Sequence, residues 1–172
     1  HTNEIAQSEA YLGHKWCNYW FHILHLNTNS GKMSKSKGEF LTVSLLESKG
    51  YDPLVYRFFC LQSHYRKSLV FTYENLDNAK TAYNKLTARI AQLMADKKPD
   101  EVVELEDFEK FKGSFKAALD DDINTSNAIT VLYDVLKADT NNETKLALIE
   151  DFDKVLSLGL IEAAKKLSAD GE

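Results

Sequence analysis

Apolar residues recur at intervals of three and four over most of the chain after residue 42, which is the spacing of one face of an α-helix. The longest series follows Thr72, a residue type that caps helix N-termini. Its apolar members are Leu76, Ala79, Tyr83, Leu86, Ile90 and Leu93. This pattern predicts a long amphipathic helix whose apolar side packs against other helices.

Shorter helices are predicted on both sides of this one. Before it, Thr42 can cap a helix that ends at Gly50, and Pro53 suits the first turn of the next helix. After it, residues 97–100 form the expected linker, and three amphipathic helices follow. Their apolar faces consist of Phe108, Phe111, Phe115 and Leu119; of Ile129, Leu132, Val135 and Leu136, after a cap at Thr125 or Ser126; and of Leu146, Ile149, Phe152 and Leu156, after Asn142. Short connections between such helices favour a bundle, and residues 168–172 are expected to fray.

Residues 1–41 follow a different pattern. Asn3 to Leu12 has helical spacing and ends at Gly13. Trp16 to Leu26 is rich in aromatic and β-branched residues, which predicts one or two buried strands. A turn at residues 27–31 then leads into the polar, cationic sequence KMSKSKG. We therefore expect a mainly α chain whose strands lie near its beginning.

Composition and charge narrow the class of protein. A hydrophobic content of 44% and a charged content of 27% are typical of a globular protein, and no stretch approaches the ~20 apolar residues of a membrane span. Cys17 and Cys60 form no CxxC motif, which fits a reducing, cytoplasmic compartment. Residues 1–90 hold 11 Lys and Arg against 7 Asp and Glu, a net charge of +4, so the other residues carry −9 of the total of −5. Phosphate chemistry is therefore expected in the first part of the chain.

The loop Lys32-Met33-Ser34-Lys35-Ser36 carries the candidate chemistry. Two lysines flank small hydroxyl residues after a predicted strand, so their ammonium groups can close over a triphosphate and stabilise the leaving pyrophosphate. Short motifs of Lys and Ser also occur as plain solvated surface turns, and from the loop alone that alternative stays open.

Further stretches place the loop in a family. The first ten residues, HTNEIAQSEA, resemble the H-x-N-E-x-A-Q-S-E-A stretch of cysteinyl-tRNA synthetases. Residues 19–22, YWFH, resemble the family's Tyr-Trp-x-His strand, and residues 64–66, HYR, and 120–125, DDDINT, match two more of its motifs. These motifs come in the family's order and extend over nearly the whole chain. The chain therefore resembles the C-terminal part of these class I enzymes.

The resemblance implies an ATP-dependent cysteine–tRNA ligase that forms AMP and pyrophosphate. Cysteine and ATP, with Mg²⁺, would give cysteinyl-adenylate, and the cysteinyl group would then move to the 3′ end of tRNA. Lys32 and Lys35 would be catalytic, and Met33, Ser34 and Ser36 would join them in binding ATP. The family also uses an active-site zinc that binds the substrate thiolate and rejects serine, because zinc favours a soft thiolate over a hydroxyl.

Glu4 matches one zinc ligand of the family, whose other ligands would precede residue 1. Without the resemblance, Glu4 is an ordinary acid in the first turn of a helix. A rival set has plausible ligand types: His14, Cys17, His22 and His25. Strand alternation would, however, point His22 and His25 to opposite faces, so core or edge histidines are the simpler interpretation.

Arg66 and Lys67 are candidate tRNA contacts, or alternatively cations at a helix C-terminus. The acidic residues 120–122 could hold a metal, but an acidic helix end before a cap is the favoured interpretation. After the loop, residues 37–39 read Lys-Gly-Glu where the family has an apolar residue, Gly and Asn, which leaves the effect of Glu39 open. A HIGH-type nucleotide motif does not occur in these 172 residues.

We therefore expect part of a longer protein. Residues 1–41 would be a remnant of a class I, Rossmann-like catalytic domain with one or two strands. Residues 42–96 would be a connecting helical region with the first long bundle helix, and residues 97–172 the remainder of a tRNA-binding bundle. Alone, the chain is expected to fold but not to catalyse. Alternatives are a non-catalytic tRNA-binding module and an ATP-dependent ligase that joins cysteine to an amino sugar. We expect a cytoplasmic monomer without membrane contact.

Overall fold

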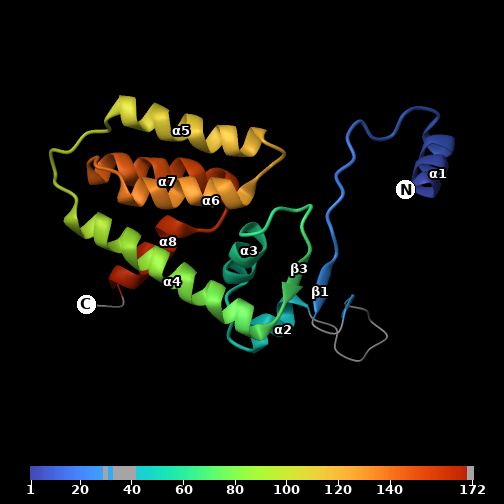
Figure 1. The fold of residues 1–172 in the computed structure, drawn as a ribbon, viewed down its shortest axis with the longest axis horizontal. Helices are drawn as coiled ribbons and strands as arrows, with labels where there is room; N and C mark the ends of the chain where they lie inside the picture. Colours follow the sequence, from blue (N-terminus) through green and yellow to red (C-terminus); the bar gives the residue numbers. More distant parts are fainter. Residues whose placement is uncertain (29–30, 33–41, 170–172) are drawn as a thin grey trace.

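The computed structural model describes residues 1–28, 31–32 and 42–169 (Figure 1). The described residues form eight helices and three short strands, which confirms the prediction of a mainly α chain. The helices are α1 (Thr2–Leu12), α2 (Val43–Ser48), α3 (Pro53–Leu61), α4 (Tyr73–Asp96), α5 (Leu105–Asp120), α6 (Thr125–Lys137), α7 (Asn142–Leu156) and α8 (Leu160–Ala169). The strands are β1 (Leu26–Thr28), β2 (Gly31–Lys32) and β3 (Leu69–Phe71). None of the described helices is long and apolar enough to cross a membrane.

The three strands form one small sheet in the order β2-β1-β3. β1 pairs antiparallel with β2, with Asn27 opposite Lys32, and parallel with β3, with Leu26 opposite Leu69. The connection from β1 to β3 contains α2 and α3, because parallel neighbours need a long crossover. β3 lies outside the region in which strands were expected. Residues 29–30, which belong to the predicted turn, lie outside the described residues.

The stretch Trp16 to Leu26 is not the buried strand or two that its composition predicts, because Leu26, the first residue of β1, is its only residue in a strand. Residues 14–25 have a different structure. They lie outside regular secondary structure, and Tyr19 and Ile23 are 90% and 65% exposed. A strand needs neighbours that donate and accept backbone hydrogen bonds. Within the described residues, the backbone bond found for this stretch joins Leu24 N–H to Tyr65 C=O. The prediction is wrong because these aromatic and β-branched residues have no described strand beside them.

Five of the described helices, α2, α3, α4, α6 and α7, begin at a polar side chain that caps them. Thr42 and Thr72 cap α2 and α4 through hydroxyl oxygens that accept the backbone N–H three residues on, at 3.1 and 3.0 Å, which confirms both predicted caps. The predicted cap of α6 at Thr125 or Ser126 is wrong, because Asn124 takes that role. The hydroxyl of Thr125 instead donates to the end of α3.

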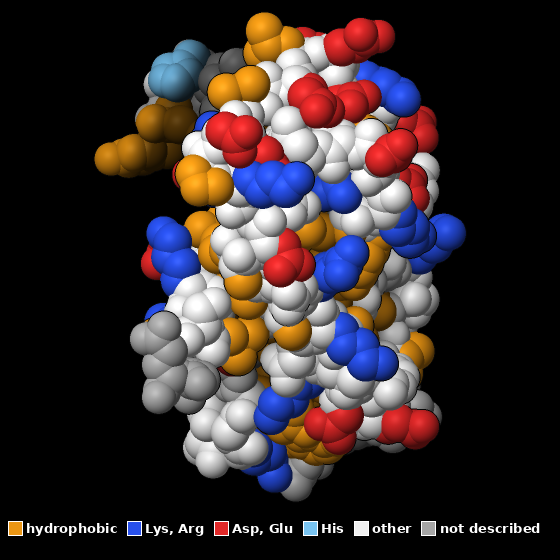
Figure 2. All heavy atoms as spheres, turned by 90° about the vertical axis from the view of Figure 1, so that its left-hand side faces the viewer, with side chains coloured by type: hydrophobic (Ala, Val, Ile, Leu, Met, Phe, Trp, Pro, Cys, Tyr) orange, Lys and Arg blue, Asp and Glu red, His pale blue; other side chains and the backbone are white. Residues whose placement is uncertain are grey.

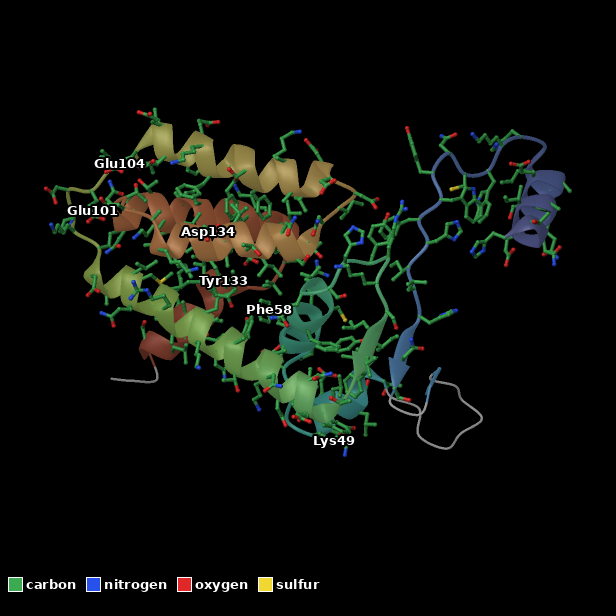
Figure 3. The ribbon with its side chains drawn as sticks, in the orientation of Figure 1. Lys49, Phe58, Glu101, Glu104, Tyr133 and Asp134 are labelled. Carbon is green, nitrogen blue, oxygen red and sulfur yellow. The ribbon has the colours of Figure 1, made fainter. Side chains whose placement is uncertain are left out.

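The core lies between α3 and the helices α4 to α8, where the predicted apolar faces meet. Fully buried positions include Leu76, Leu86, Ile90, Leu132, Leu148, Ile149 and Leu156. Phe58 of α3, labelled in Figure 3, points into this core. Its ring lies against that of Tyr83 of α4, with centroids 6.0 Å apart. Phe115 of α5 stacks on Phe152 of α7 at 4.0 Å. The remaining phenylalanines of α5 are only partly buried, since α5 lies on the outside of the bundle (Figure 1).

The last helix, α8, is absent from the sequence prediction, and it covers residue 168, where fraying was expected. It follows a turn in which Ser157 has a left-handed backbone, φ 51°. The Asp153 carboxylate accepts hydrogen bonds from the N–H groups of Leu158 and Leu160, at 2.7 and 2.9 Å. The start of α8 is thus capped by a residue of α7. The usual local signal, a polar residue directly before the helix, does not occur here.

The turn between α7 and α8 is also fastened to the preceding helices. Arg57 Nε of α3 donates to Leu156 O at 2.6 Å, and Tyr83 Oη of α4 donates to Leu158 O at 2.7 Å. Burial raises the pKa of Tyr83 to about 12, so its hydroxyl remains a donor at neutral pH. These bonds hold the end of the bundle onto the helices that adjoin the sheet.

Charge is distributed unevenly over the bundle. In Figure 2, acidic side chains gather over the upper part, where α5 lies in Figure 1, and Lys and Arg are more frequent below. The linker before α5 and its first turn carry Asp100, Glu101, Glu104, Glu106 and Asp107. Figure 3 places Glu101 and Glu104 at the end of the molecule far from α1. A polyanion would be repelled from that end.

Candidate functional site

The loop with the candidate chemistry lies largely outside the described residues. Met33, Ser34, Lys35 and Ser36 all fall in the stretch 33–41 that the structure does not describe. The backbone of the remaining loop residue, Lys32, closes β2, where it pairs with β1. The sheet therefore sets the point from which the loop begins. The catalytic roles of the two lysines, and ATP binding by all five residues, stay predictions.

The candidate zinc ligand Glu4 lies in the first turn of α1, beside His1. Its Oε1 is 3.8 Å from His1 Nδ1, and the two side chains are 58% and 51% exposed. His1 also stacks on Trp20 and His22, with ring centroids 5.2 and 4.9 Å apart. In the part of the chain that the structure describes, no three His, Cys, Asp or Glu side chains are grouped as metal ligands. These residues alone therefore do not fit a four-ligand zinc ion.

The rival ligand set is likewise dispersed among local contacts. Cys17 Sγ donates to Tyr19 O at 2.8 Å, and His14 Nδ1 lies 2.9 Å from Lys15 O. His22 is engaged in the aromatic stack with His1. The described residues therefore give these groups roles in holding an exposed segment together.

A second candidate site joins the turn after α3 to the turn between α5 and α6. Asp122 lies in the latter turn with a left-handed backbone, φ 55°. Its Oδ1 accepts a hydrogen bond from Tyr65 Oη at 2.5 Å, and its Oδ2 lies 2.9 Å from Arg66 Nε in an ion pair. His64 Nε2 lies 3.7 Å from the same Oδ2. We call these four residues the Asp122 cluster.

The structure around the cluster distinguishes between the alternative interpretations of residues 64–67 and of residues 120–122. α3 ends at Leu61, so residues 64–67 form a separate turn, and the alternative of cations at a helix C-terminus is wrong. α5 ends at Asp120, which confirms an acidic helix end before a cap. The pairing of Asp122 with the turn at residues 64–66 could not be read from the sequence, because these residues are 56 or more positions apart.

Arg66 is held on one side and open to solvent on the other. Its Nε donates to Tyr65 Oη at 2.9 Å, and its Nη2 donates to Asp122 Oδ1 at 3.4 Å. The hydrogen bond with Tyr65 and the charge of Asp122 raise the pKa of Arg66 above its ordinary value. Its side chain is nevertheless 68% exposed. The guanidinium is thus charged, oriented and accessible.

A groove of about 590 Å³ lies beside the cluster. Its lining includes Phe21 of residues 14–25, Tyr56 and Cys60 of α3, and His64 and Lys67 of the turn after α3. Burial raises the pKa of the Cys60 thiol and raises that of Tyr56 to about 12, so both stay uncharged at neutral pH. The lining of the groove is mainly apolar, and Lys67 contributes a cation to it.

Comparison with known protein families assigns the two parts of the chain to two domains. Residues 1–81 match the model of the class I (C) tRNA synthetase catalytic domain, and residues 114–160 match the DALR domain. The small parallel sheet, its crossover helices and the bundle agree with these matches. Together they define part of a class I aminoacyl-tRNA synthetase.

Curated relatives narrow the class further. The chain is 40% identical to cysteine–tRNA ligase 1 of Burkholderia lata over 94% of its length, and 40% identical to the cysteine–tRNA ligase of Novosphingobium aromaticivorans over 96%. It is 44% identical to the corresponding ligase of Bacillus thuringiensis over 78% of its length. The chain belongs to the cysteine–tRNA ligase family. It spans about a third of the length of these relatives, covering 33%, 36% and 30% of them.

Proposed function

We propose that this chain is part of a cysteine–tRNA ligase, which activates cysteine with ATP and transfers it to the 3′ end of tRNA. The observation that carries the proposal is the similarity to curated cysteine–tRNA ligases over nearly the whole chain. The order of the two domain matches, catalytic then DALR, supports it. A cytoplasmic location and a monomeric state follow as further proposals.

In this proposal Lys32 and Lys35 stabilise the triphosphate while pyrophosphate leaves, with Mg²⁺ bound to ATP. Fixed cations at developing charge are worth ~2–4 kcal/mol of barrier for each contact. Met33, Ser34 and Ser36 complete the ATP-binding loop. Glu4 would serve as one zinc ligand only in a complete enzyme, because the described chain supplies no full set of donors.

The helical part would bind tRNA. Arg66 and Lys67 are proposed contacts with the phosphate backbone, since the turn that carries them is exposed and cationic. The acidic end near Glu101 and Glu104 would face away from the nucleic acid. The proposed division of labour is a catalytic remnant at residues 1–41, a connecting region at 42–96 and a tRNA-binding bundle at 97–172.

The 172 residues alone are proposed to bind tRNA without catalysing. A loop that closes over ATP accelerates the reaction only if other groups hold the nucleotide in line. The family's HIGH-type motif, which would serve that purpose, does not occur in this sequence.

Fluorescence anisotropy with a labelled cysteine tRNA transcript, together with cysteine-dependent ATP–pyrophosphate exchange, tests this proposal. We expect binding that weakens as salt rises, and no exchange. The double variant Arg66→Ala/Lys67→Ala should weaken binding. The control Lys97→Ala/Lys98→Ala lies beside the acidic end at Glu101 and Glu104, which is proposed to face away from the nucleic acid, and should change binding little. Absence of tRNA binding at low salt would refute the binding role. Pyrophosphate exchange by the 172 residues alone would refute the proposal that catalysis needs groups outside this sequence.

A further inference from the structure

Two stretches that carry the family resemblance meet at a single carboxylate. Residues 64–66 belong to the segment matched by the catalytic-domain model, and Asp122 belongs to the segment matched by the DALR model. They are 56 or more positions apart in the chain. Thr125 Oγ1 reinforces the junction by donating to Leu61 O at 2.8 Å. The Asp122 cluster is therefore a polar joint between the two domains.

The contacts in the Asp122 cluster leave one edge of the Arg66 guanidinium free to bind a ligand. Arg66 uses Nε and Nη2 toward Asp122, and Nε also toward Tyr65. Among the described residues, no protein group accepts a hydrogen bond from its Nη1. A guanidinium presents its donors as a planar fork, so a carboxylate bound along one edge turns the other edge outward. The outward edge has the geometry that a phosphate binds in a bidentate manner.

We propose that Asp122 is a positioning residue that holds Arg66 with this outer edge directed at a tRNA phosphate. The inference rests on the proposed function, in which Arg66 contacts tRNA. Asp122 itself does not touch the nucleic acid. It acts by removing the rotamer freedom that Arg66 would otherwise lose when tRNA binds, which is the way preorganisation raises affinity.

Removal of the Asp122 charge should change tRNA binding in opposite directions, depending on whether Asp122 orients Arg66 or acts only through its charge. A carboxylate near a phosphate repels it, so removal of the charge should strengthen tRNA binding if charge alone matters. If Asp122 positions Arg66, the same removal should weaken binding. The chain offers a matched control in Asp121, which carries the same charge one residue earlier. It is the C-cap residue directly after α5, and its side chain makes no contact among the described residues. Asp121→Asn reports the effect of charge alone.

Asp122→Asn should keep the turn intact. The residue has φ 55°, a left-handed conformation that Asn adopts at least as readily as Asp. Tyr65→Phe offers a second route to the same question without any change in charge. It removes the hydroxyl that bonds to both Asp122 and Arg66, at 2.5 and 2.9 Å, and keeps the ring that packs on Phe21.

The experiment measures anisotropy of the labelled cysteine tRNA transcript over a series of salt concentrations, with circular dichroism and thermal melting as a check on folding. We expect Arg66→Ala to raise Kd about tenfold, the loss of one charge-assisted hydrogen-bonded contact, and to reduce the salt slope by about one. Asp122→Asn and Tyr65→Phe should each raise Kd about threefold. Asp121→Asn should leave Kd unchanged or lower it. Asp122→Asn in the Arg66→Ala background should have no further weakening effect.

The possible outcomes separate the two proposals. If the unaltered chain does not bind tRNA, the proposed binding role fails and the inference fails with it. If the chain binds tRNA and Arg66→Ala weakens it, but Asp122→Asn behaves like Asp121→Asn and Tyr65→Phe has no effect, the positioning role is refuted and the binding role stands. If Asp122→Asn does not fold, Tyr65→Phe decides: weakening supports the inference, and unchanged Kd overturns it.

Discussion

Apolar side chains are largely exposed in residues 1–25 and largely buried in residues 42–169. α1 buries none of its residues, and the segment after it exposes Trp16, Tyr19 and Ile23. Residues 42–169, by contrast, turn nearly every predicted apolar face inward, with Leu132, Leu148 and Ile149 fully buried. The first region is separated from the bundle in Figure 1. The contrast shows that hydrophobicity stabilises a segment only where a complementary surface is present.

The difference has a structural cause. Amphipathic helices find their partners among near neighbours in the chain, so a bundle can form from local contacts. Aromatic residues in an extended segment need a strand or a layer on each side, and such partners are usually distant in sequence. In residues 14–25 the rings pack against one another instead, as Trp16 does edge-to-face against Trp20, with centroids 5.3 Å apart. This clustering covers only part of their surface.

The largest expected effect compares one phenylalanine from each region. Phe152→Ala removes a side chain that is 1% exposed and stacked on Phe115, so it should lower the free energy of unfolding by about 3–5 kcal/mol. Phe21→Ala removes a ring that is 52% exposed and should cost less than about 1 kcal/mol. Urea unfolding followed by circular dichroism measures both. Equal losses would mean that the first region is packed as firmly as the bundle.

A smaller effect is expected at the turn between α7 and α8. Asp153→Ala would remove the acceptor for two backbone N–H groups, those of Leu158 and Leu160, and should cost about 1–3 kcal/mol. The control Asp134→Ala alters an exposed carboxylate on α6 that lies 3.9 Å from Lys137, and should change stability by less than about 0.5 kcal/mol. The same urea titration compares them. A cost at Asp153 no larger than the control would show that α8 does not depend on this cap.

The smallest effect is a pH dependence at the surface of the bundle. Hydrogen bonds from Lys154 and Lys112 lower the pKa of Asp151 below its ordinary value of 3.8. A carboxyl group with a lowered folded-state pKa contributes stability above its unfolded pKa, and loses it as pH falls through the folded pKa. Asp151→Asn should therefore cost about 0.5–1 kcal/mol at pH 7, and the difference should vanish in acid. Glu162→Gln, at a more exposed pair with Lys165, is the control. A difference that persists below the lowered pKa would contradict the ionic origin.

The sequence predicts the bundle better than it predicts the sheet, for reasons visible at single residues. Thr42 and Thr72 carry their own capping signals, so the helices after them begin where expected. The sequence pattern does not predict α8, because the residue that caps it, Asp153, lies seven positions before Leu160. The sequence pattern does not predict β3 either, because this strand forms by pairing with a segment more than forty positions away, as Leu69 does with Leu26.

The candidate site is also predictable from the sequence only in part. The lysine loop is recognisable from a short run of residues, because its chemistry depends on side chains adjacent in the chain. The sequence indicates Arg66 as part of the HYR motif and as a candidate tRNA contact, but it does not indicate how the side chain is held. Its partner Asp122 is set by the packing of α3 against the α5–α6 turn, which no local pattern specifies. Tertiary contacts of this kind determine the orientation of a functional group, and the sequence indicates only its type.

The most direct measurement replaces the matching segment of the Burkholderia lata ligase by residues 1–172 of this chain and follows ATP–pyrophosphate exchange with cysteine. We expect the chimera to exchange pyrophosphate in a cysteine-dependent way and then to aminoacylate cysteine tRNA. Lys35→Ala in the chimera should slow exchange by ~10²–10³-fold with little change in the KM for cysteine, whereas the control Lys137→Ala should leave it unchanged. A folded chimera that activates a different amino acid, or whose exchange is indifferent to Lys35→Ala, would contradict the assignment of this chain to cysteine activation.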